Sequence, residues 1–383
     1  MPGLKELTNI WENVREVDLR PIREEASQEV KILLAGRQGS GRRTLAENMR
    51  RDPARPGVHT TTPIAILDLE VDEQAVKSAD LIVIMVSASG EESERHRLLS
   101  QEWTRAGKKV IVFYNMSDRG AGAENAGSSF AWEASKMLLG PAGDPEFLLA
   151  EFVPAVMEIL PEQNLSLARH FPLFRVPVAK HLINETSFSN AVYSLSTGLA
   201  EIVPVLDIPL NISDMIVLTK AQAFLVYRLG LAFGFSTEWQ DYLSEFGSVV
   251  GGGFLWRQLA RQLVGLIPVW GIVPKVAVAY AGTYVVGNVI LRWYLTGRKV
   301  SPAQIRAMYR EAFDQGKKVA GELVDKVPRP RLRRRRDRQL PAAIEPAGQV
   351  CPNCGKTSAP DAQYCQYCGE PLTGQATEAA SGK

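Results

Sequence analysis

Over residues 28 to about 205, short apolar runs alternate with stretches whose apolar residues recur at helical spacing. The apolar runs, which predict buried strands, are Val30–Ala35, Ile64–Leu69, Leu81–Val86, Val110–Tyr114 and Phe174–Val178. The stretches with helical spacing are Arg43–Met49, Glu92–Ala106, Ala131–Leu139, Phe147–Leu160 and Phe188–Val203. This alternation predicts an α/β fold with a doubly wound, mostly parallel sheet, and the Gly- and Ala-rich piece Gly120–Ser129 predicts a loop.

The pattern changes beyond residue 205. Long apolar stretches with helical spacing, such as Ile216–Phe235 and Phe254–Leu295, predict an all-α domain over residues 206–325. Residues 326–348 are rich in Pro and Arg and predict an extended linker, residues 349–372 predict a small separate module, and residues 373–383 predict a disordered tail. Within residues 1–27, apolar positions at helical spacing predict an amphipathic helix and not a secretory signal. Those positions are Leu4, Leu7, Trp11 and Val14.

Composition is that of a globular protein: 383 residues, 45% hydrophobic and 22% charged, enough for two or three domains. The net charge is +2, but Arg329–Arg338 alone holds seven Arg and one Asp, so the rest of the chain is slightly acidic. All four Cys lie between Cys351 and Cys368, which leaves no upstream disulfide and indicates a reducing, cytoplasmic compartment.

A glycine-rich turn, Gly36–Thr44, follows the first strand and precedes a helix. In this setting backbone N–H groups and a helix amino end cradle phosphate. Arg42 and Arg43 stand where such loops carry Lys and a magnesium-binding Ser or Thr. Thr44 comes one residue late, about 100° further round the helix. The turn therefore predicts anion binding and disfavours Mg²⁺ coordination.

A second polar segment, Asn115-Met-Ser-Asp118, directly follows the strand Val110–Tyr114. Ligands of doubly wound sheets bind at the carboxyl ends of strands. An Asp there accepts two hydrogen bonds from a guanine edge, and an Asn ties loops together. Met116 stands where a Lys would cover the base, and its apolar stem suits that contact.

On these two motifs, residues 28–205 resemble the Era-type small GTPases. Gly36–Leu45 is similar to the first motif of that family and Asn115–Asp118 to its Asn-Lys-x-Asp motif. The resemblance implies a P-loop GTPase-like domain with GTP or GDP as ligand, and a switch threonine at Thr60, Thr61 or Thr62. The nucleotide-binding residues it implies are Gly36, Gly39, Ser40, Gly41, Arg42, Arg43, Thr44, Asn115 and Asp118.

The chain departs from the family at several positions. Asp68-Leu-Glu-Val71 stands where the family has Asp-x-x-Gly, and Glu70 and Asp72 would repel phosphate. Because positioning and electrostatics are nearly all of phosphoryl-transfer catalysis, we assign no catalytic residue. Three interpretations stay open: a tight turn on an inherited fold, weak guanine-nucleotide binding without efficient hydrolysis, and an active, atypical GTPase.

The strongest chemical motif is a pair of turns with the same Cys-x-x-Cys spacing, Cys351-Pro-Asn-Cys354 and Cys365-Gln-Tyr-Cys368. A Gly follows each turn. Four thiolates complete a tetrahedral site for structural Zn²⁺, and the segment resembles compact zinc ribbons. A redox dithiol and a disulfide pair are the alternatives. So small a piece needs its metal to fold, and it is suited to docking an unknown protein partner.

The stretch Leu263–Leu291 carries one charge, Lys275, and approaches the length of a membrane span. Pro268 and Pro274 are expected to break its first half, and basic residues at both ends suit a hairpin or an interface-lying segment. A buried helix pair is the alternative.

Residues 210–320 resemble the YcjF-like helical domain of unknown function. The matching features are Gly251–Gly253, Leu266–Gly271 and Ala277–Leu291. That domain occurs joined to Era-type GTPase domains, and proteins that carry it are often regarded as membrane-associated. The resemblance therefore implies membrane association on the cytoplasmic face.

The arginine run Arg329–Arg338 has three interpretations. It suits an anionic membrane surface, at roughly 1 kcal/mol per residue, or nucleic-acid phosphates, or it is a solvated linker. Our leading hypothesis is a membrane-associated regulatory or scaffold protein whose GTPase-like domain binds guanine nucleotide weakly or not at all. An active GTPase and a nucleic-acid-binding protein that uses the ribbon and the arginine run are the alternatives.

Overall fold

The computed structural model describes residues 19–68, 72–87, 94–116, 132–200, 212–238, 272–298, 300–326, 349–359, 362–365, 367–368 and 370–372. The chain divides into two compact units, Met1–Val327 and Pro328–Lys383. Several predicted features lie outside the described residues. They are the helix positions Leu4 to Val14, the loop Gly120–Ser129, Asp118, Gly251–Gly253, Leu266–Gly271, the arginine run and the C-terminal tail.

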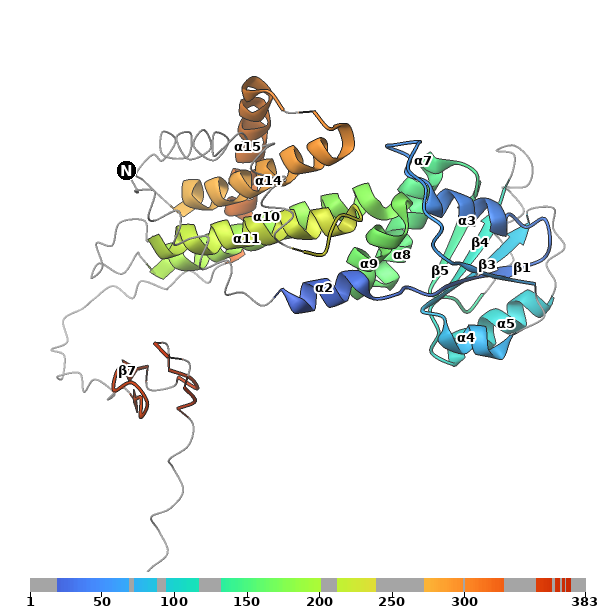
Figure 1. Cartoon of the computed structure of the whole chain (residues 1–383), viewed down its shortest axis with the longest axis horizontal. Coiled ribbons are helices and arrows are strands. Elements are labelled where there is room, and N and C mark those ends of the chain that lie inside the picture. Colours follow the sequence, from blue (N-terminus) through green and yellow to red (C-terminus); the bar gives the residue numbers. More distant parts are fainter. Residues whose placement is uncertain are drawn as a thin grey trace, which may run out of the picture. The chain divides into compact units, whose positions relative to one another are not determined.

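A five-stranded, all-parallel sheet forms one end of the first unit, in the order β2-β1-β3-β4-β5 (Figure 1). Its strands are β1 (Ile32–Gly36), β2 (Ala65–Leu67), β3 (Leu81–Ser87), β4 (Val110–Asn115) and β5 (Lys136–Gly140). The central strands are buried on both faces, as expected for near-continuous apolar runs. The α/β prediction and its first four strands are confirmed.

Helices cover both faces of the sheet. On one face α4 (Glu73–Ser78) and α5 (Glu94–Arg105) pack against alternate strand residues. On the other face lie α3 (Arg42–Arg50) and a continuous helical stretch that comprises α7 (Pro145–Phe147), the π-turn η1 (Leu148–Phe152) and α8 (Val153–Ile159). Figure 1 shows the two layers on opposite sides of the strands.

Two predicted elements are wrong. Phe174–Val178, read as a strand, instead forms the end of η3 (Pro172–Phe174) and the start of α10 (Arg175–Ala200). Its Val-Pro-Val pattern looks extended, but a proline in the first turn of a helix needs no N–H partner. Ala131–Leu139, read as a helix, holds most of strand β5. Its Met and Leu residues favour helices intrinsically, and pairing with β4 overrides that preference.

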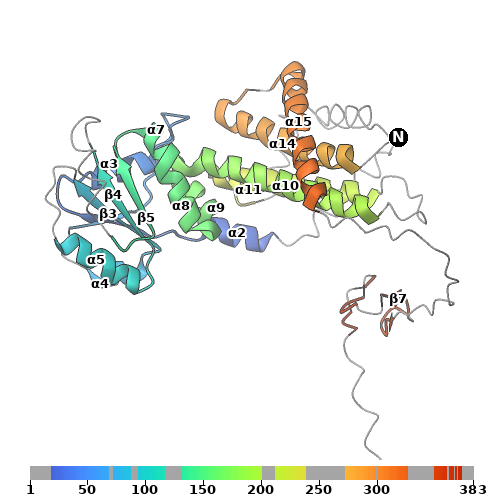
Figure 2. The same ribbon diagram turned by 180° about the vertical axis from the view of Figure 1, so that it is seen from behind.

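Outside the sheet region, the described residues from 145 to 326 are mostly helical, which agrees with the all-α prediction for residues 206–325. The short helices α2 (Arg20–Ser27), η2 (Pro161–Gln163) and α9 (Asn164–His170) lead into α10. α10 packs against α11 (Ile212–Ala232), α14 (Ile272–Thr296) and α15 (Pro302–Lys326), which Figure 2 shows from behind. One hydrophobic core runs from one face of the sheet through α10 to α14 and α15.

Within the described residues one helical segment, Val273–Thr296, has the length and apolarity to cross a membrane, and 67% of its apolar window is buried in the protein. Two positions that interrupt its apolar pattern are packing sites. The Thr283 hydroxyl accepts hydrogen bonds from Asn190 (2.8 Å) and Gln222 (3.3 Å), and a Cβ on Gly287 would lie 2.6 Å from the Ile183 side chain. Pro274 does not break the helix, because it lies in the first turn of α14.

Candidate functional sites

The glycine-rich turn connects β1 directly to α3. Gly39 and Gly41 adopt left-handed backbone angles (φ +85° and +95°), which glycine tolerates without strain. A Cβ on Gly36 would lie 2.4 Å from the Met85 carbonyl oxygen, so the turn approaches β3 closely. The turn therefore occupies the carboxyl end of the sheet where the strand order reverses, which is the usual ligand position in doubly wound folds.

Asn115 ties this turn to the neighbouring loop, the role expected for an Asn at this position. Its Nδ2 donates to the Ser40 carbonyl oxygen (3.1 Å), and its Oδ1 accepts from the Ala142 N–H (2.9 Å). Asn48 of α3 donates to the Ala142 carbonyl oxygen (2.9 Å). Side-chain amides therefore hold together the glycine-rich turn, the end of β4 and the loop after β5.

Arg42, which stands where the resemblance expects a lysine, is already engaged. Its guanidinium donates to the Leu67 carbonyl oxygen and, at 2.6 Å, to the Asp68 carboxylate at the end of β2. The Arg42 side chain is only 10% exposed, whereas Asp68 is 70% exposed. The acid that begins the Asp-x-x-Gly-like segment and the cation of the turn thus neutralise each other. Arg43 and Thr44 are exposed.

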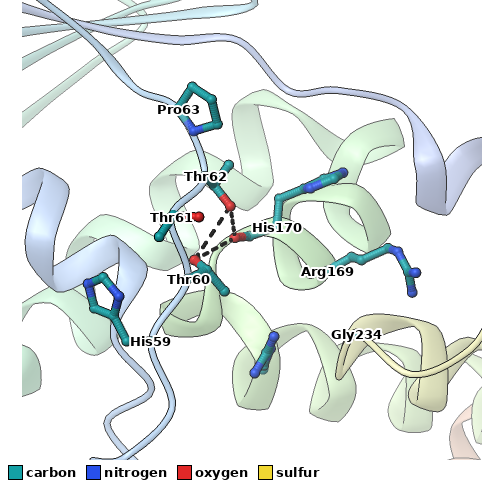
Figure 3. A pocket seen from close by; sticks show the side chains of 9 residues that line it. His59, Thr60, Thr61, Thr62, Pro63, Arg169, His170 and Gly234 are labelled. Carbon is teal, nitrogen blue, oxygen red and sulfur yellow. Dashed lines mark hydrogen bonds between the residues drawn. The ribbon is translucent and has the colours of Figure 1, made fainter.

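A second polar site lies away from the turn, where residues 59–63 meet the helical region. It is an open cleft of about 510 Å³, lined by His59, Thr60, Thr61, Thr62, Pro63, Arg169, His170, Arg175 and Gly234 (Figure 3). The hydroxyls of Thr60 (3.1 Å) and Thr62 (2.7 Å) both donate to the His170 carbonyl oxygen at the end of α9. Two of the three candidate switch threonines are thus bonded to a helix end.

The two arginines of the cleft also contact helix ends. Arg169 donates to the carbonyl oxygens of Leu231 (3.1 Å) and Phe235 (2.9 Å), and Arg175 donates from Nε to that of Ala168 (3.4 Å). Leu231 and Ala168 lie in the last turns of α11 and α9, and Phe235 follows α11. Burial and then the charge of nearby Arg55 lower the pKa of Arg175 to about 10. No local sequence motif predicts this cleft.

In the second unit the four Cys form one cluster, with their sulfur atoms within 4.8 Å of one another. The Sγ atoms of Cys351 and Cys368 lie 3.5 Å apart, and those of Cys354 and Cys365 lie 3.6 Å apart. A disulfide requires about 2.05 Å. A tetrahedral ion with metal–sulfur bonds of about 2.3 Å places its sulfurs about 3.8 Å apart, so the cluster fits a metal such as zinc.

The backbone of the second unit presents these thiols in two turns. The first turn follows β6 (Gln349–Val350), which pairs with β7 (Thr357–Ser358). Gly355 donates its N–H to the Cys351 carbonyl oxygen (2.9 Å) and has a φ of +69°, as predicted for the glycine after a Cys-x-x-Cys turn. The N–H of Cys365 is held by the Glu370 carbonyl oxygen (2.7 Å).

Comparison with protein-family models and with curated proteins finds no match to this chain. Its class is therefore defined by its own architecture. A parallel α/β sheet is joined to a helical region and followed by a four-cysteine module.

Proposed function

We propose that this chain is a regulatory or scaffold protein built on an Era-like GTPase domain that does not turn over nucleotide. The ion pair between Arg42 and Asp68 carries the proposal. In the family that residues 28–205 resemble, the turn supplies a lysine for the phosphates, and the Asp-x-x-Gly segment serves the metal-bound γ-phosphate. In this chain the residues at these two positions, Arg42 and Asp68, form an ion pair with each other instead.

Electrostatics explains why this pairing opposes Mg-GTP binding. An Arg-bound carboxylate is a poor metal ligand, because its charge is already neutralised and one oxygen already accepts a hydrogen bond. A phosphate could recruit Arg42 only by breaking its contacts with Leu67 and Asp68. Weak nucleotide binding without magnesium stays compatible with the turn, since Arg pairs well with phosphate.

Calorimetry with GTP and with ATP, each with and without Mg²⁺, tests this proposal, together with the nucleotide content of the purified protein. We expect no magnesium-dependent binding and no turnover. The double variant Arg42→Lys/Arg43→Ser, which rebuilds the usual turn and frees Asp68, should gain magnesium-dependent affinity. Arg51→Lys is the matched control, because Arg51 is an exposed α3-end residue paired with Glu47. Tight Mg-GTP binding with phosphate release by the natural chain would refute the proposal.

We further propose that the four-cysteine module is a zinc ribbon that docks a protein partner. A closed four-thiolate site has no open position for catalysis, so its role is structural. The module exposes three large apolar side chains, Val350 (63%), Tyr364 (62%) and Tyr367 (56%), which is much apolar surface for so small a piece. Substituting Tyr364 and Tyr367 by Ser should weaken partner capture while zinc content stays unchanged.

Membrane association is proposed at the cytoplasmic surface, through the arginine run and not through insertion of α14. The burial of α14 against its neighbouring helices favours this form. Binding to anionic vesicles should be strong at low salt and lost at high salt, because exposed charges are screened. Binding that survives high salt and carbonate would contradict surface association, and no binding at low salt would remove the membrane proposal.

A further inference from the structure

Three cationic side chains gather in and beside the cleft between residues 59–63 and the helical region. Arg169 and Arg175 line it, and Arg55 lies close enough to act on Arg175 electrostatically. None of the described residues that line the cleft is acidic. The nearby Asp52 carboxylate is fully buried and is already paired with Arg55 at 2.9 Å. The group therefore keeps an excess positive charge.

The cleft also offers hydrogen-bond donors that the fold does not use. Arg175 is only 5% exposed, and its one hydrogen bond within the described part of the chain is the 3.4 Å contact of Nε with Ala168. A guanidinium has five N–H donors, so four remain on the two terminal nitrogens. Thr61 lines the same cleft, and Figure 3 draws hydrogen bonds for the hydroxyls of Thr60 and Thr62 but none for that of Thr61.

Such an arrangement is costly without a counter-ion. A buried guanidinium beside two others loses hydration and is repelled by its neighbours, and the depressed pKa of Arg175 reflects both effects. An anion removes the repulsion and supplies acceptors for the free N–H groups. Guanidinium groups bind phosphate oxygens through paired, charge-assisted hydrogen bonds, which makes phosphate a better match than a halide.

We propose that this cleft binds a phosphate group, held by the guanidinium groups of Arg169 and Arg175 and by the Thr61 hydroxyl. The open cleft, with a volume of about 510 Å³, has room for more than one phosphate group. The ligand is therefore a phosphomonoester, either a soluble small molecule or a lipid headgroup. None of the residues of the turn Gly36–Thr44 line the cleft, so this site is independent of the nucleotide proposal.

The test is denaturation of the full-length, zinc-loaded protein in inorganic phosphate and in chloride at equal ionic strength. At ten times the dissociation constant, phosphate should shift the folding equilibrium about eleven-fold toward the folded state. Arg175→Gln should abolish this shift. Because replacing the buried Arg175 can destabilise the fold, Thr61→Glu is the second variant. Residue 61 is exposed, and a carboxylate there would pair with the arginines in place of phosphate. Arg310→Gln, an exposed site on α15, is the matched control and should respond like the natural chain.

Two further arms separate the sources of the phosphate group. Glycerol 3-phosphate tests a soluble ligand, and phosphatidylcholine vesicles with phosphatidic acid test a headgroup against vesicles with phosphatidylserine. Binding in either arm that Thr61→Glu removes identifies the source and supports the site. Equal stabilisation by phosphate and chloride, or a phosphate response that Thr61→Glu retains, would overturn the proposal. In the second case the arginine run would be the binding element.

Discussion

Whether α14 is covered by protein can be tested at one glycine of α15. Gly316 faces α14, and a Cβ built on it would lie 2.9 Å from the Ala277 carbonyl oxygen and 3.0 Å from the Ala277 Cα. Both are backbone atoms of α14, so relief requires a shift of one helix against the other. Gly321 lies on the same helix with nothing within 4 Å of its built Cβ. The pair Gly316→Ala and Gly321→Ala therefore separates packing from helix propensity.

The expected magnitudes follow from two terms. Replacing Gly by Ala within a helix stabilises it by about 1 kcal/mol. Overpacking a tight contact costs about 1–3 kcal/mol. Gly321→Ala should therefore raise the free energy of unfolding by about 1 kcal/mol, and Gly316→Ala should leave it unchanged or lower it by up to about 2 kcal/mol. The difference between the two variants is the packing term alone, about 1–3 kcal/mol.

Urea denaturation followed by circular dichroism measures this difference, because the long helices dominate the signal. The two variants share a background and a mutation type, so effects on the unfolded chain largely cancel. Equal stabilisation by both substitutions would refute the reasoning. It would mean that α15 does not press on Ala277 and that this face of α14 is free for another partner, a bilayer included.

Three further outcomes are expected. Thr283→Val should lower the free energy of unfolding by about 1–3 kcal/mol in urea titrations, because Asn190 and Gln222 lose a buried acceptor, whereas Thr296→Val on the exposed end of α14 should change little. Native mass spectrometry should find one zinc ion per chain and none in Cys365→Ser, and retention of zinc by that variant would contradict a four-thiolate site. Burial, then Arg169, lowers the pKa of His170, so the folded state binds this proton less readily than the unfolded chain does. Protonation of His170 therefore does not reduce the free energy of unfolding above about pH 6.5, but it reduces that free energy as the pH falls below this value. In His170→Gln the urea midpoint should lose this part of its pH dependence.

The sheet could be predicted largely because its central strands are buried on both faces. β1, β3 and β4 are short, nearly continuous apolar runs, the pattern typical of strands buried on both faces. β5 is different: it is an edge strand with Met137 and Leu139 each about two-fifths exposed. Its composition alone does not distinguish it from a helix, and only pairing with β4 decides.

Whether each candidate site could be predicted from the sequence likewise depends on whether a local motif encodes it. The four-cysteine cluster and the loop-tying role of Asn115 could be predicted, because local motifs encode them. The pairing of Arg42 with Asp68 could not, because it joins residues 26 apart through the adjacency of β1 and β2. The phosphate cleft joins segments about a hundred residues apart and has no local spacing to recognise. Nucleotide contact by the turn, and any role of Asp118, stay predictions.

Within the proposed function, the glycine-rich turn and the cleft at residues 59–63 suggest how the sheet domain would respond to a ligand. In a switching GTPase, the segment before the Asp-x-x-Gly strand must be free to change position with the nucleotide. Under the proposed function, residues 59–63 correspond to that segment. They are bonded to the end of α9 through Thr60 and Thr62, and Arg50 of α3 donates to the Thr62 carbonyl oxygen at 2.9 Å. In that proposal, contacts with the helical region take the place of a γ-phosphate in positioning this segment. An anion in the cleft beside Thr61 would act on this same segment, which makes the cleft, and not the glycine-rich turn, the place where a ligand would influence how the sheet meets the helices.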